Sequence, residues 1–153
     1  MLTIPPYQVW INKANQDNQP FFRFTLLYIG LVQFIRHQHQ YQKDYDNDWD
    51  VIATYIEHRE QAFANLPPQD SLKVALQSLK HYLEETKPLT NKHEETVRLD
   101  SLRDYFYALK IIRNNLFHAD EEFTHSRDDR LVELGADILE IVFSHKLFQK
   151  ETE

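Results

Sequence analysis

The sequence predicts an all-α protein, a single domain built as a bundle of about five helices. Apolar residues recur along most of the chain with the 3.6-residue period of a helix. Only two glycines occur among the 153 residues, whereas sheets joined by tight turns need residues that tolerate a positive φ. The length suits one domain with a core of its own, and no repeat or shift of composition marks a second.

The first part of the chain is expected to be an extended arm rather than part of the bundle. Residues 1–20 are polar and carry Pro5, Pro6 and Pro20, and proline disfavours regular hydrogen-bonded structure. The helical bundle itself is therefore expected over residues 21–150.

Two helices are predicted in the first half of the bundle. The first covers residues 21–41, and its stretch 24–35 is apolar almost all round, as is typical of a central helix. The second covers residues 49–65 and ends before Pro67, because the residue before a proline avoids the helical conformation.

Three further helices are predicted, over residues 71–85, 93–117 and 128–150. Asp70 or Ser71 can cap the first of these. Its apolar stripe consists of Leu72, Leu76, Leu79 and Leu83. Polar segments around Pro88 and after residue 117 separate the three helices.

Composition limits the range of functions. The net charge is −7, which disfavours indiscriminate nucleic-acid binding, although grouped cations could still bind RNA. Cysteine is absent, so a disulfide framework is impossible. No signal peptide is recognisable, and the longest apolar run, about a dozen residues, is shorter than the ~20 that span a bilayer. A cytoplasmic protein is expected.

Arg113 stands out in the helix predicted over residues 93–117. At 100° per residue, Leu102, Phe106 and Leu109 form a core stripe, and Arg113 falls within about 20° of its centre. A guanidinium there is costly unless it is paired or opens onto a cleft or a subunit interface.

Two explanations of this position are open. Arg113 could pair with a carboxylate such as Glu133 or Asp137, while His118 merely caps the helix end. Alternatively, Arg113 belongs to a functional site with Asn114 and His118, which share a helix face because they lie four residues apart.

The segments "IIRNNLFHADEEF" and "RDDRLVELGADILEIVF" resemble the carboxyl half of HEPN domains, a helical family named for higher eukaryotes and prokaryotes nucleotide-binding. The family signature is an arginine, a polar residue and a histidine near the end of one helix. Here these are Arg113, Asn114 and His118, in the compact form "RNNLFH".

The resemblance implies a HEPN-like fold and a function. Many members are metal-independent endoribonucleases of toxin–antitoxin or antiviral defence systems. They act as homodimers in which two copies of the motif face one cleft. The expected partners are therefore RNA, a second copy of the chain and a cognate antitoxin protein, with no cofactor, metal or membrane.

The residue types suit RNA cleavage by the 2′-hydroxyl. Histidine titrates near neutrality, so His118 is expected to transfer the proton. Arginine binds phosphate oxygens in a bidentate manner, so Arg113 is expected to hold the phosphate and Asn114 to orient His118 or the substrate. Arg127 and Arg130 are candidates for contacts with the RNA backbone, and Tyr107 is a candidate for base stacking.

A non-catalytic HEPN module that binds a partner or a nucleotide is the alternative. It is favoured by the net charge and by Asp120, Glu121 and Glu122, which place negative charge beside the proposed cleft. Asp120 also stands where a tyrosine occurs in HEPN toxins that are paired with nucleotidyltransferase antitoxins, so modification there is not implied.

Overall fold

The computed structural model describes residues 5–39, 47–116 and 125–149, and helices dominate these ranges. Within them the chain forms seven α-helices and one short 3₁₀ helix and no strand. The elements are α1 (Pro6–Asn15), α2 (Pro20–His39), α3 (Asp48–Glu57), α4 (Glu60–Ala64), α5 (Ser71–Glu85), α6 (Leu102–Leu116), α7 (His125–Ser144) and η1 (Lys146–Phe148). The all-α class is confirmed, and the described helices outnumber the five that were expected.

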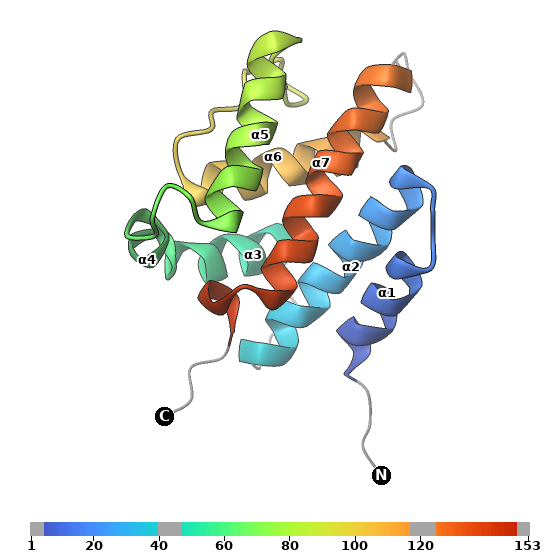
Figure 1. The fold of residues 1–153 in the computed structure, drawn as a ribbon, viewed down its shortest axis with the longest axis vertical. Helices are drawn as coiled ribbons and strands as arrows, with labels where there is room; N and C mark the ends of the chain where they lie inside the picture. The colour runs from blue at the N-terminus through green and yellow to red at the C-terminus, as the bar shows by residue number, and fades with distance from the viewer. Residues whose placement is uncertain (1–4, 40–46, 117–124, 150–153) are drawn as a thin grey trace.

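The helices form two layers around α7 (Figure 1). Helices α1, α2, α7 and α5 lie side by side in that order, and each contacts the next. Helices α3 and α6 cross behind them and contact each other, and they also contact α2 and α7 respectively. The core lies between the layers, and it includes Phe24, Phe106 and Phe148, whose side chains are fully buried.

Helix α1 forms where an extended arm was expected. Pro6 stands at its first position, where the missing N–H costs no helical hydrogen bond. Ala14 is fully buried, and the Tyr7 ring packs edge-on against Phe34 of α2 at 5.1 Å. Burial against α2 therefore stabilises a helix that its own polar sequence does not predict.

The helix predicted over residues 49–65 is divided into α3 and α4 at Arg59. The Arg59 N–H bonds the Ile56 carbonyl at 2.8 Å, and the Arg59 Nη1 bonds the Tyr55 carbonyl at 2.9 Å. The side chain thus contacts the acceptor that the regular i−4 bond would use. Arg59 Nε also donates to the Leu147 carbonyl at 3.1 Å, so the break is fixed by a distant segment.

Helix α6 begins at Leu102, about nine residues later than predicted. Ser101 and Asp104 form a reciprocal cap, because Ser101 Oγ accepts from the Asp104 N–H and Asp104 Oδ2 accepts from the Ser101 N–H. The Glu60 carboxylate accepts from the N–H groups of Leu102 and Arg103 at 3.1 and 2.7 Å. These acceptors define the start of the helix.

The last predicted helix, over residues 128–150, likewise ends early, at Ser144. The chain then turns at His145 and places Phe148 in the core. The Phe148 ring stacks with Tyr55 at 6.2 Å, and the Tyr55 hydroxyl donates to the Phe148 carbonyl at 3.0 Å. Residues 145–149 thereby bind to the layer formed by α3 and α6.

His145 joins this turn to the start of α5. Its Nδ1 accepts from the Leu147 N–H at 3.0 Å, so its Nε2 carries the hydrogen that is donated to the Asp70 carboxylate at 2.9 Å. Asp70 also caps α5 by accepting from the Leu72 N–H. Burial alone would raise the pKa of Asp70, but the hydrogen bonds from His145 and Leu72 outweigh it and lower the pKa.

Gly135 allows α7 to approach α2 closely. A Cβ atom at this position would lie 2.5 Å from Cε2 of the buried Phe24 ring. At Gly30, which faces α1, the nearest atom would be 3.4 Å away, an ordinary contact.

We expect Gly135→Ala to lower the free energy of unfolding by about 1–3 kcal/mol, because overpacking displaces the Phe24 ring. The gain in helix propensity, about 0.8–1 kcal/mol, does not offset this cost. Gly30→Ala is the matched control and should be neutral or stabilising. Urea unfolding of both variants measures the difference, and equal stability of the two would contradict the close approach.

Asp70→Ala should lower the free energy of unfolding by about 2–4 kcal/mol, since the helix cap is lost and a buried His145 N–H is left without an acceptor. Asp70→Asn keeps the cap and should cost less. Because the folded-state pKa of Asp70 is lowered, its charge stabilises the fold above the ordinary Asp pKa of ~3.9, and this contribution is lost as the pH falls through the lower folded value.

Urea unfolding from neutral pH down to about pH 3 checks this prediction. The difference in stability between the wild type and Asp70→Asn should be constant near neutrality and shrink in acid. A difference that grows as the pH falls would have the wrong sign for this assignment.

Candidate functional site

Arg113 lies in the last turn of α6 and is half-buried. Its guanidinium carbon is 4.7 Å from the centre of the Tyr28 ring on α2. Its Nη2 donates to Asn114 Oδ1 at 3.1 Å. An aromatic face and a neutral amide therefore surround the charge, as a cation–π contact permits. The position on the core stripe agrees with the sequence prediction.

The two carboxylates that the sequence suggested as partners of Arg113, Glu133 and Asp137, are paired with other arginines. Glu133 accepts from Arg130 at 3.1 Å, and Asp137 lies 3.9 Å from Arg23. Within residues 5–39, 47–116 and 125–149, Arg113 forms no salt bridge with any carboxylate. The charge at the end of α6 is thus held beside the core without being neutralised by an acid in the described part of the chain.

Tyr28 is suited to support this cation in neutral form. Burial raises the pKa of Tyr28 to about 12, Arg113 lowers it and Asp48 adds to the increase. The phenol therefore remains protonated at any physiological pH. It offers the guanidinium a π face and no negative charge, which leaves the positive charge of Arg113 available to an outside anion.

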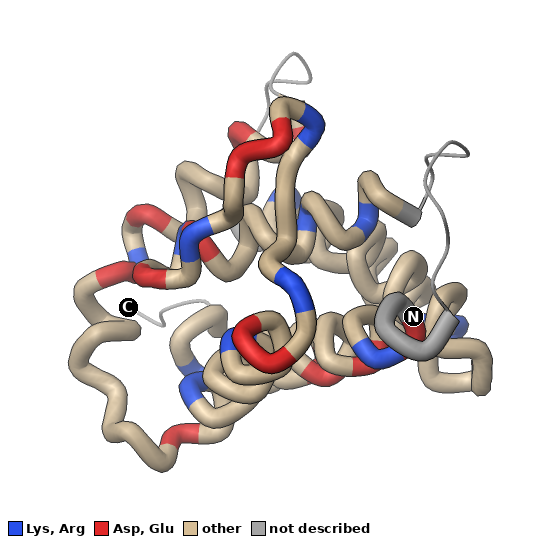
Figure 2. The backbone as a smooth tube through the Cα atoms, turned by 90° about the horizontal axis from the view of Figure 1, so that it is seen from above, with Lys and Arg blue, Asp and Glu red and all other residues tan. Residues whose placement is uncertain are grey.

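Lys110 lies one turn before Arg113 and adds positive potential. Burial, Arg113 and Lys92 lower the pKa of Lys110, in that order, whereas Asp50 opposes the shift. Two cations close enough to perturb a third indicate a locally basic surface on an acidic protein. Figure 2 shows acidic and basic positions interspersed along the backbone. A basic surface on this chain therefore depends on a few cations that lie close together.

Tyr107, expected to stack RNA bases, lies on the same helix and is half-buried. Its ring meets Trp49 of α3 at 5.4 Å in an edge-on contact, and its hydroxyl accepts from Asn91 Nδ2 at 3.4 Å. The structure thus brings Tyr107 to an aromatic partner that sequence reasoning missed. Trp49 could not be identified from the sequence, because the contact depends on how α3 packs against α6.

Of the other predicted site residues, Arg130 is the one whose side chain belongs to the described part of the chain. His118 lies outside the described residues. Arg127 belongs to α7, but its side chain lies outside the described part. Arg130 is exposed on α7 and pairs with Glu133. The described structure therefore shows how the arginine and asparagine of the motif lie, and the functional roles of all three motif residues stay predictions.

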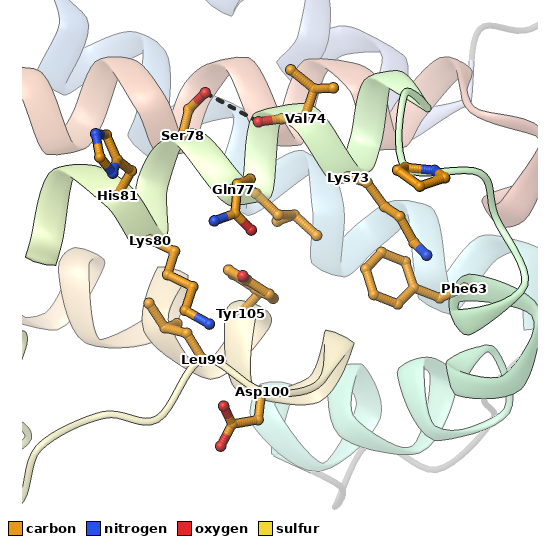
Figure 3. A pocket seen from close by; sticks show the side chains of 12 residues that line it. Phe63, Lys73, Val74, Gln77, Ser78, Lys80, His81, Leu99, Asp100 and Tyr105 are labelled. Carbon is orange, nitrogen blue, oxygen red and sulfur yellow. Dashed lines mark hydrogen bonds between the residues drawn. The ribbon is translucent and has the colours of Figure 1, made fainter.

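A groove of about 710 Å³ lies elsewhere, between α5 and the start of α6. Figure 3 shows Phe63, Gln77 and Tyr105 reaching into it from α4, α5 and α6. Lys73 borders it, but its ammonium donates to the Leu66 carbonyl at 2.8 Å and closes the end of α4. No sequence motif pointed to this groove, and its lining combines no group of residues with a recognisable reaction.

The described ranges hold no cluster of three or more histidine, aspartate or glutamate side chains that could hold a metal ion. In the same ranges, no helix has the length and apolar character needed to cross a membrane.

Arg113→Gln should lower the free energy of unfolding by about 0.5–2 kcal/mol, the magnitude of a cation–π contact. Breaking a buried salt bridge would cost about 3–5 kcal/mol, because a carboxylate would be left unpaired. Urea unfolding separates these values. A loss in the higher range would mean that an acid neutralises Arg113 after all.

Comparison of the chain with protein-family models, with curated protein sequences and with solved structures found no match. The geometry of α6 and its neighbours therefore carries the functional argument.

Proposed function

We propose that this protein is a metal-independent endoribonuclease of the HEPN type, acting in the cytoplasm in a toxin–antitoxin or antiviral defence system. One observation carries the proposal. Arg113 is half-buried against Tyr28 and hydrogen-bonded to Asn114, and it has no carboxylate partner among the described residues. A guanidinium held in this way is ready to bind a phosphate, which supplies the missing negative charge.

The reaction needs few groups. A base takes the proton of the ribose 2′-hydroxyl, the 2′ oxygen attacks the adjacent phosphorus, and the bond to the 5′ oxygen breaks. The leaving oxygen takes up a proton, so the products carry a cyclic 2′,3′-phosphate and a 5′-hydroxyl. His118 is assigned proton transfer, and Arg113 stabilises the charge that grows on the phosphate oxygens.

Asn114 has two roles open to it. Its Oδ1 accepts from Arg113, so it restrains the guanidinium, and its amide nitrogen remains a donor for the substrate or for His118. In the proposed homodimer, two copies of the α6 end face one cleft, and RNA lies between them. A cognate antitoxin would cover that cleft.

A non-catalytic nucleotide-binding or interaction module is the second candidate. The net charge of −7 and the acids Asp120, Glu121 and Glu122 directly after His118 favour it. Arg113 and Lys110 would bind one phosphate group in such a module, and no bond would be cleaved.

Purified protein incubated with a mixed RNA pool in EDTA should cleave it, because the chemistry uses side chains alone. Arg113→Ala and His118→Ala should each lower the rate by at least about 100-fold, as is typical for loss of a general acid or base or a charge-stabilising donor. Arg98→Ala is the control, since Arg98 is an exposed arginine that pairs with Asp100 just before the start of α6, at the opposite end of the helix from Arg113.

The cyclic phosphate ends can be detected by mass spectrometry of the products. Equal cleavage by the wild type and all variants would identify a contaminating nuclease. Absence of cleavage, with nucleotide binding that Arg113→Ala abolishes, would favour the non-catalytic module.

Sedimentation should give a particle of twice the chain mass of 18.4 kDa, because the proposed cleft needs two protomers. The cleavage rate per chain should fall steeply when the protein is diluted below its dimerisation constant. A monomer with an undiminished rate per chain would exclude the shared cleft.

A further inference from the structure

Helix α6 carries a row of polar and aromatic side chains that leads to Arg113. Arg103, Tyr107, Lys110 and Asn114 follow one another at intervals of four, three and four residues, which places them on one face of the helix. The row is separate from the core stripe, and it lies beside the segment that precedes α6, since Asn91 bonds the Tyr107 hydroxyl.

Trp49 of α3 lies against this row. The Lys110 ammonium is 5.3 Å from the centre of its indole and the Arg103 guanidinium carbon is 5.5 Å away, while Tyr107 meets it edge-on. Trp49 and Tyr107 are both half-buried. Each residue is therefore partly exposed, while its contacts hold the ring in place.

The cations of this face differ in whether a carboxylate pairs with them. Arg103 Nε lies 3.7 Å from Glu57, which neutralises that end of the row. Lys110 and Lys92 form no ion pair with any carboxylate among the described residues, and Asp50 is the acid that acts on Lys110 from nearby. Positive charge thus accumulates toward Lys110 and Arg113, beside the two aromatic rings.

We propose that this face, formed by Trp49, Tyr107 and Lys110, binds an unpaired RNA strand and leads it toward Arg113. The inference rests on the proposed function for the identity of the ligand. Aromatic rings can stack on exposed bases, and lysines can contact the phosphates between them. A duplex hides its base faces and offers only backbone, for which an acidic chain with so few grouped cations is poorly suited.

Binding is best measured in the His118→Ala background, where the proposed cleavage does not consume the probe. The probe is a fluorescein-labelled oligouridylate of about 16 nucleotides, the upper end of the range for single-strand sites. Its binding should be followed by anisotropy at several salt concentrations, with an RNA duplex of the same length as competitor. The single strand should bind at least about tenfold more tightly than the duplex.

Lys110→Gln should weaken binding about fivefold and lower the slope of log K against log salt by about 0.7, the value for one phosphate contact on a single strand. Lys80→Gln is the matched control, because Lys80 is a half-exposed lysine on α5, at the groove of Figure 3. It should change neither quantity. Trp49→Phe keeps a ring in place and should weaken binding by a smaller factor.

A direct readout comes from tryptophan emission. The chain has two tryptophans, so Trp10→Phe leaves Trp49 as the sole emitter, and the probe without its label should quench it at saturation. Unchanged emission, unchanged binding by Lys110→Gln, or a duplex that binds as tightly as the single strand would each overturn the proposal. Quenching and Lys110-dependent binding without any RNA cleavage by the wild type would keep the binding face and reject the nuclease.

Discussion

The missing side chain of Gly135 is the constraint on which the site depends. It lets α7 approach α2 until the Phe24 ring occupies the space of a Cβ atom. Tyr28 follows Phe24 by one helical turn, and the two rings lie 6.2 Å apart. The same packing therefore fixes the aromatic face on which the Arg113 guanidinium rests. The packing of α7 against α2 thus helps to set the position of the Arg113 guanidinium on α6.

The electrostatics of that charge explain why it is tolerated. A salt bridge would satisfy the guanidinium but also cancel its field. A neutral tyrosine and an amide satisfy part of its hydrogen-bonding and polarisation needs and leave the field intact. Two acids of α7, Asp137 and Glu133, are engaged elsewhere, with Arg23 and Arg130 respectively. Both carboxylates are therefore already paired with an arginine other than Arg113.

The sequence predicted the bounds of a helix well where the helix has its own capping residue and its own stripe of apolar side chains. Helix α5 matches the prediction, because Asp70 caps it and its four leucines face the core. The predicted helix ends were wrong where contacts with residues distant in the sequence determine them. Residue 59 ends α3 because its side chain reaches the Leu147 carbonyl, and Glu60 helps to fix the start of α6. The stripe position of Arg113 was predictable, but its support by Tyr28 and the contact of Trp49 with Tyr107 arise from helix packing.

The hydrogen bond between Tyr55 and Phe148 has a consequence for folding during synthesis of the chain. It joins residues 93 positions apart, and the Phe148 ring fills the core between α3, α6 and the turn at His145. Contacts of such long range form late, since the intervening chain must first be ordered. During synthesis, the side of Tyr55 that packs on Phe148 therefore stays uncovered until Phe148 has left the ribosome, and apolar surface that is exposed over such an interval favours aggregation.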